Sequence, residues 1–380
     1  MSTFDFDHLI DRSQSHSEKW SKYQDLLVLP MWVADTDFAS PPCVMEALHQ
    51  RIDHSVFGYT HTPDELVEVF IARAKQRYDW SVAAESLVWL PGLVCGLNLA
   101  CRSVGESGDQ VLSATPIYPP FISAPKLSDR VAVKVPMKEV NQRWVIDLEG
   151  LKAQLTDRTR LVLFCNPHNP GGTVYRKEEL DALAAFVIEH DLYICSDEIH
   201  CDLILEPGLK HIPIASLSEE IAKRTITLMA PSKTFNIAGL GCSVAIIPDP
   251  TLRSAFNRVR RGIVPDANLL GYTAALAAYK DGDDWNQAQC TYLKDNRDYL
   301  MQRLNALPGV TLRPIEATYL AWIDFSGTDI QDLPHTFEDA GVGMSPGRDF
   351  GNDRFMRLNF GCPRSRLEEA VARIERVFTK

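Results

Sequence analysis

The sequence has no long run of Lys and Arg, and this absence excludes one class of partner. Asp and Glu total 50 against 39 Lys and Arg, which gives a formal net charge of −11 at pH 7. Nucleic-acid phosphates are bound by clustered positive charge. The fullest basic cluster lies at residues 253–261, where a solvated helix end explains it. We therefore expect no nucleic-acid partner.

Long apolar runs and a secretion signal are also missing. No apolar stretch reaches the ~18–20 residues that a membrane-spanning helix needs. The first twelve residues carry three acidic side chains and lack the basic and apolar regions of a signal peptide. From this we expect no membrane association and a cytoplasmic location.

The cysteines do not form a recognisable framework. There are 9, an odd number, and no CxxC pair or Cys/His metal spacing occurs among them. Most stand inside apolar segments such as LVLFCNP and LYICSDE. We expect them to be small buried apolar side chains, and we expect no metal site.

What is present is an alternation of short apolar runs with amphipathic stretches of about 10–17 residues. This rhythm is typical of βαβ units and predicts an α/β fold. The fold would have a mostly parallel seven-stranded sheet flanked by helices. We expect strands at residues 87–90, 110–113, 131–136, 161–165, 192–195, 225–229 and 244–247.

Helix signals lie between these runs. In residues 62–65, Thr62 is predicted as an N-cap, Pro63 as the first helical residue and Glu65 as the partner in a capping box. Residues 40–42 predict a helix start of similar form. Residues 177–190 predict a helix with one buried apolar stripe. Its stripe would consist of Leu180, Leu183, Ala184 and Val187.

The character of the sequence changes after about residue 281. A long helix at 285–307 is expected to lead to a strand at 319–325, a short helix, a strand at 355–360 and a closing helix at 364–378. The chain of 380 residues is long enough for two domains. We assign residues 41–281 to a large domain, and residues 282–380, completed by residues 1–40, to a smaller α/β domain.

Two charged side chains follow neighbouring predicted strands. Lys233 stands in APSKTFN and Asp197 in CSDEIH. A lysine at a buried strand end is desolvated, which lowers the pKa of its amine and favours imine formation with an aldehyde. A carboxylate facing a pyridine nitrogen keeps it protonated and makes the ring an electron sink. Taken alone, such a lysine is more often a surface or ion-pairing residue, and such an aspartate an N-cap or metal ligand.

Three further residues follow other strands. The amide of Asn166, in the rigid turn CNPHNPGG, can reach the phenolic oxygen of a pyridoxal ring. Gly92 opens a helix whose N–H groups favour a phosphate, and Tyr118 can stack on a flat ring. Alone, these would be a structural turn, an ordinary glycine and a core aromatic. Strand ends meet at one edge of an open α/β sheet, so the set predicts a pyridoxal 5′-phosphate (PLP) site.

These residues carry a family resemblance that covers nearly the whole chain. The order Gly92, Tyr118, Asn166, Asp197, Lys233, Arg357 resembles fold-type-I PLP enzymes of the class I/II aminotransferase superfamily. A closer resemblance, to the cystathionine β-lyase (C–S lyase) branch, rests on longer segments. These are PMWVADTDF, CNPHNPGG, SDEIHCDL, APSKTFNIAGL, ATYLAWIDF and RLNFGCPR.

The resemblance implies roles around the cofactor ring. Lys233 would bind PLP covalently and then move the substrate proton. Asp197 would pair with the ring nitrogen, and Tyr118 would stack on the ring. Asn166 and His200 would lie near the phenolic oxygen.

It also implies how the phosphate and the substrate are held. Backbone N–H groups, Ser232 and a partner subunit's tyrosine would hold the phosphate. Arg357 would bind the α-carboxylate as a bidentate fork, and two residues of the N-terminal segment, Trp32 and Asp35, would line the substrate entrance. The N–H groups would be those of Gly92, Leu93 and Val94, and the tyrosine would be Tyr59.

One position departs from the aminotransferase pattern. Many aminotransferases carry a phosphate-binding Arg eight residues after the lysine, where this chain has Gly241. The lyase branch shares this departure. The resemblance therefore implies a homodimeric PLP-dependent β-lyase of S-substituted L-cysteines, most readily cystathionine, giving homocysteine, pyruvate and ammonia. A PLP-dependent aminotransferase is the alternative, and a regulatory protein that binds a transcription factor is a third hypothesis.

Overall fold

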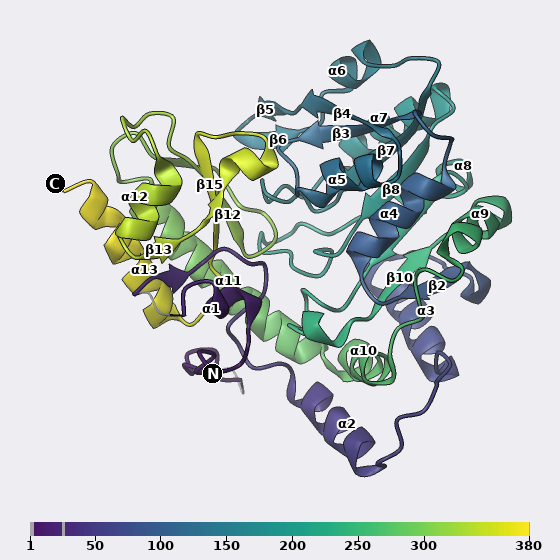
Figure 1. Cartoon of the computed structure of the whole chain (residues 1–380), viewed down its shortest axis with the longest axis horizontal. Helices are drawn as coiled ribbons and strands as arrows, with labels where there is room; N and C mark the ends of the chain where they lie inside the picture. Colours follow the sequence, from purple (N-terminus) through teal and green to yellow (C-terminus); the bar gives the residue numbers. More distant parts are fainter. Residues whose placement is uncertain (1–3, 25–26, 380) are drawn as a thin grey trace.

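The structure is a computed structural model that describes residues 4–24 and 27–379. Figure 1 shows a large sheet with helices on both faces and a second group of elements beside it. The sheet has seven strands in the order β2-β10-β9-β8-β7-β3-β4. Neighbours are parallel, except that β10 runs antiparallel to both β2 and β9. The strands are β2 Leu87–Leu90, β3 Gln110–Thr115, β4 Val131–Pro136, β7 Thr159–Cys165, β8 Tyr193–Asp197, β9 Thr225–Met229 and β10 Ser243–Ile246.

All seven predicted strands are present because apolar runs are what a doubly covered sheet requires. In β7, Leu161 and Leu163 enter one core, whereas Val162 and Phe164 enter another. Successive side chains of a strand point to opposite faces. A strand covered on both sides therefore needs an unbroken apolar sequence. The predicted α/β class with a mostly parallel seven-stranded sheet is confirmed.

Helices cover the sheet on both faces (Figure 1). The predicted helix at 177–190 is α7, and its predicted stripe is buried. Within the described part of the chain, no helix is long and apolar enough to cross a bilayer. The helices up to the end of the sheet region are α1 Glu18–Ser21, α2 Pro42–Asp53, α3 Asp64–Tyr78, α4 Leu93–Ser103, α5 Pro120–Leu127, α6 Leu148–Ala153, α7 Lys177–Glu189, α8 Glu219–Ala222, α9 Pro250–Arg260 and α10 Leu269–Asp281.

The predicted N-cap of α3 was wrong. The helix begins at Asp64, and Pro63 occupies the N-cap position without a side-chain cap. The Thr62 hydroxyl instead donates a hydrogen bond to the Tyr272 hydroxyl of α10, at 3.0 Å. At the start of α2, the Ser40 hydroxyl donates to the carbonyl of Asn236 at 3.0 Å. In both places the side chain that the local sequence predicts as a helix cap forms a tertiary hydrogen bond instead.

The C-terminal part combines helices with a four-stranded sheet in the order β11-β12-β15-β14. The N-terminal strand β1 (Leu29–Pro30) pairs in parallel with β13 (Val342–Gly343). The N-terminal segment thus lies against C-terminal elements, as Figure 1 shows. The division at residues 40 and 281 stays a prediction. The remaining elements are β5 Lys138–Val140, β6 Arg143–Val145, α11 Asp283–Leu304, β11 Thr311–Leu312, β12 Leu320–Asp324, α12 Leu333–Asp339, β14 Ser345–Pro346, β15 Phe355–Asn359 and α13 Arg364–Val377.

Helix α4 approaches the sheet closely at Gly96. A Cβ atom at this position would stand 3.0 Å from Leu228 Cδ2 on β9 and 3.4 Å from Leu90 Cδ1 on β2. Gly96 is buried, and both leucines are fully buried. A larger side chain would push the helix, and with it the turn at Gly92, away from the strand ends.

We predict that Gly96→Leu lowers the free energy of unfolding by ~1–3 kcal/mol, the usual effect of overpacking a core. Urea denaturation monitored by fluorescence measures the loss. Gly239→Ala is the matched control, because Gly239 is exposed and nothing lies within 4 Å of its Cβ position. Equal midpoints for both variants and the parent protein would contradict the close approach of α4.

Candidate active site

Three predicted site residues lie at the ends of adjacent parallel strands. Asp197 is the last residue of β8 and is paired in register with Cys165, the last residue of β7. Asn166 follows Cys165 directly, and its backbone N–H donates to the carbonyl of Asp197 at 3.0 Å. Lys233 lies four residues beyond β9, on the other side of β8. The predicted meeting of these side chains at one sheet edge therefore follows from the strand order.

Lys233 is partly exposed and donates its amine to the carbonyl oxygen of Ala34, at 2.6 Å. Burial lowers the pKa of Lys233, and the positive charge of Arg357 lowers it further, against the attraction of Asp35 and Asp197. A depressed pKa increases the neutral, nucleophilic fraction of an amine. Lys233 is therefore suited to bond to an aldehyde.

Asp197 is buried at the bottom of the same site. Its Oδ1 accepts the backbone N–H of Ile199 at 3.2 Å. Burial raises the pKa of Asp197 to about 7, although Ile199 and the charge of Lys233 oppose the shift. A buried carboxyl group of this kind gains most from a protonated nitrogen placed next to it. That is the partner a pyridine ring would supply.

His200 presents a buried nitrogen that needs a partner. Its Nδ1 has no hydrogen bond to any described residue, and the side chain is buried. Burial lowers the pKa of His200 to about 3, helped by the charges of Lys233 and Arg357, so the ring is neutral. Asn166, also buried, donates one amide hydrogen to the carbonyl of Ile212 at 3.1 Å. The orphaned His200 nitrogen and the second amide hydrogen of Asn166 fit a ligand with a polar ring substituent.

The proposed phosphate end is built from backbone. Gly92 is the N-cap of α4, and the next two residues form its first turn. N–H groups at a helix start have no partner within the helix and attract anions. Gly241 has φ +61°, and a Cβ atom there would stand 3.1 Å from the carbonyl oxygen of Pro91. The position that carries an arginine in many aminotransferases is thus a left-handed residue packed against the turn before α4. Leu93 is buried, Val94 is exposed and Ser232 is partly exposed.

Arg357 on β15 is a buried cation that has an unpaired N–H donor among the described residues. Its Nη1 donates to Asn169 Oδ1 at 3.1 Å and its Nη2 to the carbonyl of Trp32 at 3.0 Å. The guanidinium carbon lies 4.6 Å from the centre of the Phe350 ring. Burial lowers the pKa of Arg357 to about 10. Its Nε has no partner among the described residues, so the guanidinium can donate hydrogen bonds to a bound carboxylate.

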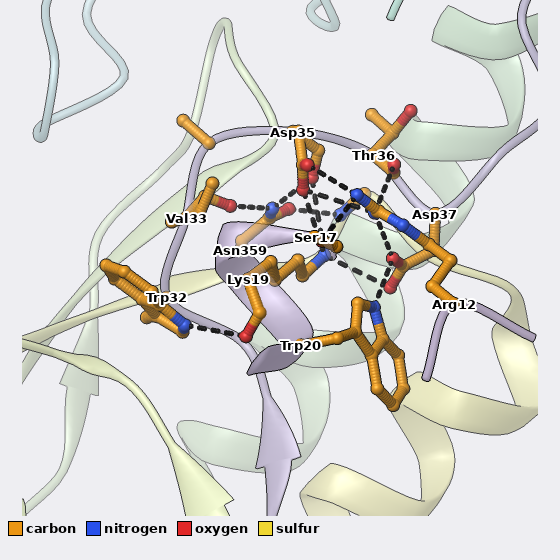
Figure 2. Close-up of polar contacts among 12 residues, drawn as sticks. Arg12, Ser17, Lys19, Trp20, Trp32, Val33, Asp35, Thr36, Asp37 and Asn359 are labelled. Atoms are coloured by element: carbon orange, nitrogen blue, oxygen red, sulfur yellow. Dashed lines mark hydrogen bonds and ion pairs between the residues drawn. The ribbon is translucent and has the colours of Figure 1, made fainter. Parts of the chain in front are cut away.

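The other predicted residues lie in different settings. Tyr118 is partly buried against the aromatic cluster of Trp322, Phe350 and Phe355. The indole N–H of Trp32 donates to the carbonyl of Lys19 at 3.1 Å. The carboxylate of Asp35 is ion-paired with Arg12 at 2.8 Å, as Figure 2 shows.

Tyr59 is not brought to the site. Its side chain is fully exposed on the loop between α2 and α3. A contact from Tyr59 to a phosphate in the same subunit is therefore not supported, which is the arrangement expected if it serves a partner subunit. That role stays a prediction.

Sequence reasoning missed several residues that hold the site in place. Asn169 stands within CNPHNPGG and Tyr319 within ATYLAWIDF, but neither segment indicates a role for these two side chains. Tyr319 is buried, and its hydroxyl donates to the carbonyl of Ala34 at 3.1 Å. The Ala34 carbonyl left no signal at all, because a backbone oxygen is present in every residue. In the part of the chain that the structure describes, no group of three or more His, Cys, Asp and Glu could hold a metal ion.

Known proteins resemble this chain over nearly its whole length. The family model for aminotransferase class I and II matches residues 29–374. The cystathionine β-lyase PatB of Bacillus subtilis (strain 168) is 38% identical, over 97% of this chain and 98% of its own. The protein MalY of Escherichia coli (strain K12) is 32% identical, over 97% of each chain.

Solved structures extend the likeness to three dimensions. The crystal structure of OvoB superposes with a TM-score of 0.97 at 53% identity, covering 99% of this chain and 100% of that one. The PLP-bound C–S lyase from Staphylococcus hominis gives 0.93 at 33% identity, covering 100% and 99%. The chain that brings Asp197 and Lys233 to one edge of its large sheet thus belongs to the aminotransferase class I and II family.

Proposed function

We propose that this protein is a PLP-dependent carbon–sulfur β-lyase that acts on S-substituted L-cysteines, with L-cystathionine as the leading substrate. The observation that carries the proposal is the placement of Lys233 and the buried Asp197 beyond adjoining parallel strands, where the charge of each affects the pKa of the other. The names of PatB and the S. hominis C–S lyase support the same reaction class. When bound, PLP would supply an electron sink for negative charge at the substrate Cα.

The residues of the chain would divide the work around that sink. Lys233 would hold the cofactor and, once the substrate amine replaces it, its free amine would accept the Cα proton. Asp197 would hold a proton on the ring nitrogen. Arg357 would orient the substrate through its α-carboxylate. With a thiolate leaving group on Cβ, elimination followed by hydrolysis with one water gives the thiol, pyruvate and ammonia.

Support for the phosphate site comes from the start of α4. The N–H groups at Gly92, Leu93 and Val94 and the hydroxyl of Ser232 would neutralise the phosphate without an arginine. Gly241 favours the lyase over the aminotransferase alternative, because it supplies no cation for the phosphate and its φ of +61° is one that residues with side chains rarely adopt. The family name keeps the aminotransferase as the second candidate.

Tyr59 supports a homodimer. It stands with Val56 and Phe57 on one exposed stretch of chain, and their side chains are 61% and 58% exposed. Isolated apolar side chains on a surface are common, but a run of three favours an interface. A second copy of this chain would cover the run and bring Tyr59 to the phosphate of the first. The cytoplasmic location also stays a prediction.

Three predictions test this proposal, and the first concerns Lys233. Lys233→Ala is expected to abolish the visible absorbance of lysine-bound PLP and to lower turnover by ~10²–10⁴, the usual contribution of a general base. Absorbance before and after borohydride treatment, followed by product assay, measures both effects. Lys177→Ala, which removes an exposed lysine of α7, is the control. Normal turnover by Lys233→Ala would end the assignment.

The second prediction separates the two candidate reactions. With L-cystathionine and PLP-loaded protein, we expect pyruvate, ammonia and homocysteine in equal amounts. Coupled lactate dehydrogenase measures the pyruvate, and a thiol reagent measures the homocysteine. Stoichiometric conversion of an added 2-oxo acid into an amino acid, without thiol release, would instead favour the aminotransferase.

The third prediction tests whether the site is shared between subunits. Tyr59→Ala is expected to weaken PLP binding, and Lys233→Ala to be inactive. When the two variants are co-expressed, hybrid dimers contain one intact site, so activity at limiting PLP should exceed that of either variant. Mixing Lys233→Ala with the double variant lacking both side chains should restore nothing. A mixture no more active than its components would remove Tyr59 from the site.

A further inference from the structure

Residues 32–37 cross the candidate site with backbone carbonyls directed at its two cations. The carbonyl of Ala34 accepts the amine of Lys233 at 2.6 Å, and the carbonyl of Trp32 accepts Nη2 of Arg357 at 3.0 Å. Both cations are therefore oriented by backbone atoms. Such atoms keep their positions only where the segment itself is fixed.

One side of residues 32–37 is held by β15, the strand that carries Arg357. Asn359 lies two residues after Arg357 and so points to the same face of that strand. Its amide donates to the carbonyls of Val33 and Asp35, the latter at 2.6 Å. The backbone N–H of Asp37 donates to the carbonyl of Gly361 at 2.9 Å.

The other side is held by Lys19 of α1, as Figure 2 shows. Its Nζ contacts Asp37 Oδ2 at 3.0 Å and the carbonyl of Asp35 at 3.3 Å. Its backbone carbonyl accepts the indole N–H of Trp32 at 3.1 Å. One lysine thus contacts both ends of the segment, and its side chain is 0% exposed.

Arg12 completes the cluster. It contacts the carboxylates of Asp35 at 2.8 Å and Asp37 at 2.7 Å, and its Nη1 donates to the carbonyl of Thr36 at 3.2 Å. Burial raises the pKa of Asp37, but the charges of Lys19, Arg366 and Arg12 outweigh it and lower the pKa to about 2. Asp37 is therefore ionised at neutral pH, and its carboxylate forms ion pairs with Lys19, Arg12 and Arg366.

We propose that Lys19 and Arg12 are positioning residues of the active site. They fix residues 32–37 where the carbonyls of Ala34 and Trp32 orient the amine of Lys233 and the guanidinium of Arg357. This inference rests on the proposed function, because it takes Arg357 as the group that binds the substrate carboxylate. Lys19 and Arg12 bond to residues 32–37 rather than to Lys233 or Arg357, so their effect passes through the segment.

The test variant is Lys19→Met in the PLP-loaded protein. It keeps the side-chain length and leaves Asp37 paired with Arg12 and with Arg366, at 3.2 Å. We expect the apparent Kd of L-alanine, read from the cofactor absorbance, to rise about tenfold, equivalent to ~1.4 kcal/mol. The limiting rate at saturating L-cystathionine should fall less. L-Alanine has no leaving group on Cβ, so its apparent Kd can be measured whether or not the protein catalyses elimination.

Hydrogen exchange provides a second reading. The amides of Asp35, Thr36 and Asp37 should exchange faster in Lys19→Met. Those of Leu29 and Met31 should not change, because the carbonyls of Gly341 and Gly343 hold them. Arg12→Lys, which keeps the charge but loses the fork, is expected to show the same pattern more weakly and serves if the first variant does not fold.

Arg303→Met is the control for the loss of an ion pair as such. Arg303 pairs with Glu375 between α11 and α13, at 2.8 Å through its Nε. Its L-alanine affinity should match that of the parent protein. The proposal is overturned if folded Lys19→Met binds L-alanine normally, or if Arg303→Met weakens binding equally. Inert cystathionine together with weakened L-alanine binding would reject the lyase and leave the positioning role standing.

Discussion

The desolvation of two opposite charges at one sheet edge is the constraint on which this structure depends. Burial raises the pKa of Asp197 to about 7 and lowers the pKa of Lys233, so water stabilises neither charge well. A protonated ring nitrogen would restore the ionised state of Asp197. A neutral amine at Lys233 is the form that attacks a carbonyl. In the proposed function, one low-dielectric site would thereby prepare an acid and an amine for opposite ends of the same ring.

Strand order explains how the parts of this site meet. β8 lies between β7 and β9, so Asp197 is flanked by Asn166 on one side and by the chain leading to Lys233 on the other. The antiparallel β10 returns the chain beside β2, which brings Gly241 against Pro91 at the turn before α4. Backbone packing at this turn would supply the N–H groups of the proposed phosphate end, and the φ of +61° at position 241 favours glycine there.

Most of the fold and part of the site could be predicted from the sequence. The strands were predictable because burial on both faces requires continuous apolar runs. Asp197 and Lys233 could be singled out because one ends such a run and the other follows one within four residues, where a charged side chain loses contact with water. The N-cap of α3 was not predictable, since Thr62 bonds to Tyr272, 210 residues away. The role of Lys19 could not be predicted from the sequence for a related reason. It stands in the polar stretch SHSEKWSK, and only tertiary contacts reveal that it is fully buried.

The buried cluster around Lys19 is weak evidence for stability and stronger evidence for placement. Removing charges from water carries a penalty that ion pairing only partly offsets, and apolar replacements of buried pairs are often as stable or more so. What apolar side chains do not offer is direction. Lys19 and Arg12 donate hydrogen bonds to specific oxygens of residues 35–37, so they fix the position and orientation of an irregular segment that belongs to no sheet. A segment whose carbonyls must aim at Lys233 and Arg357 needs that directionality more than it needs extra burial.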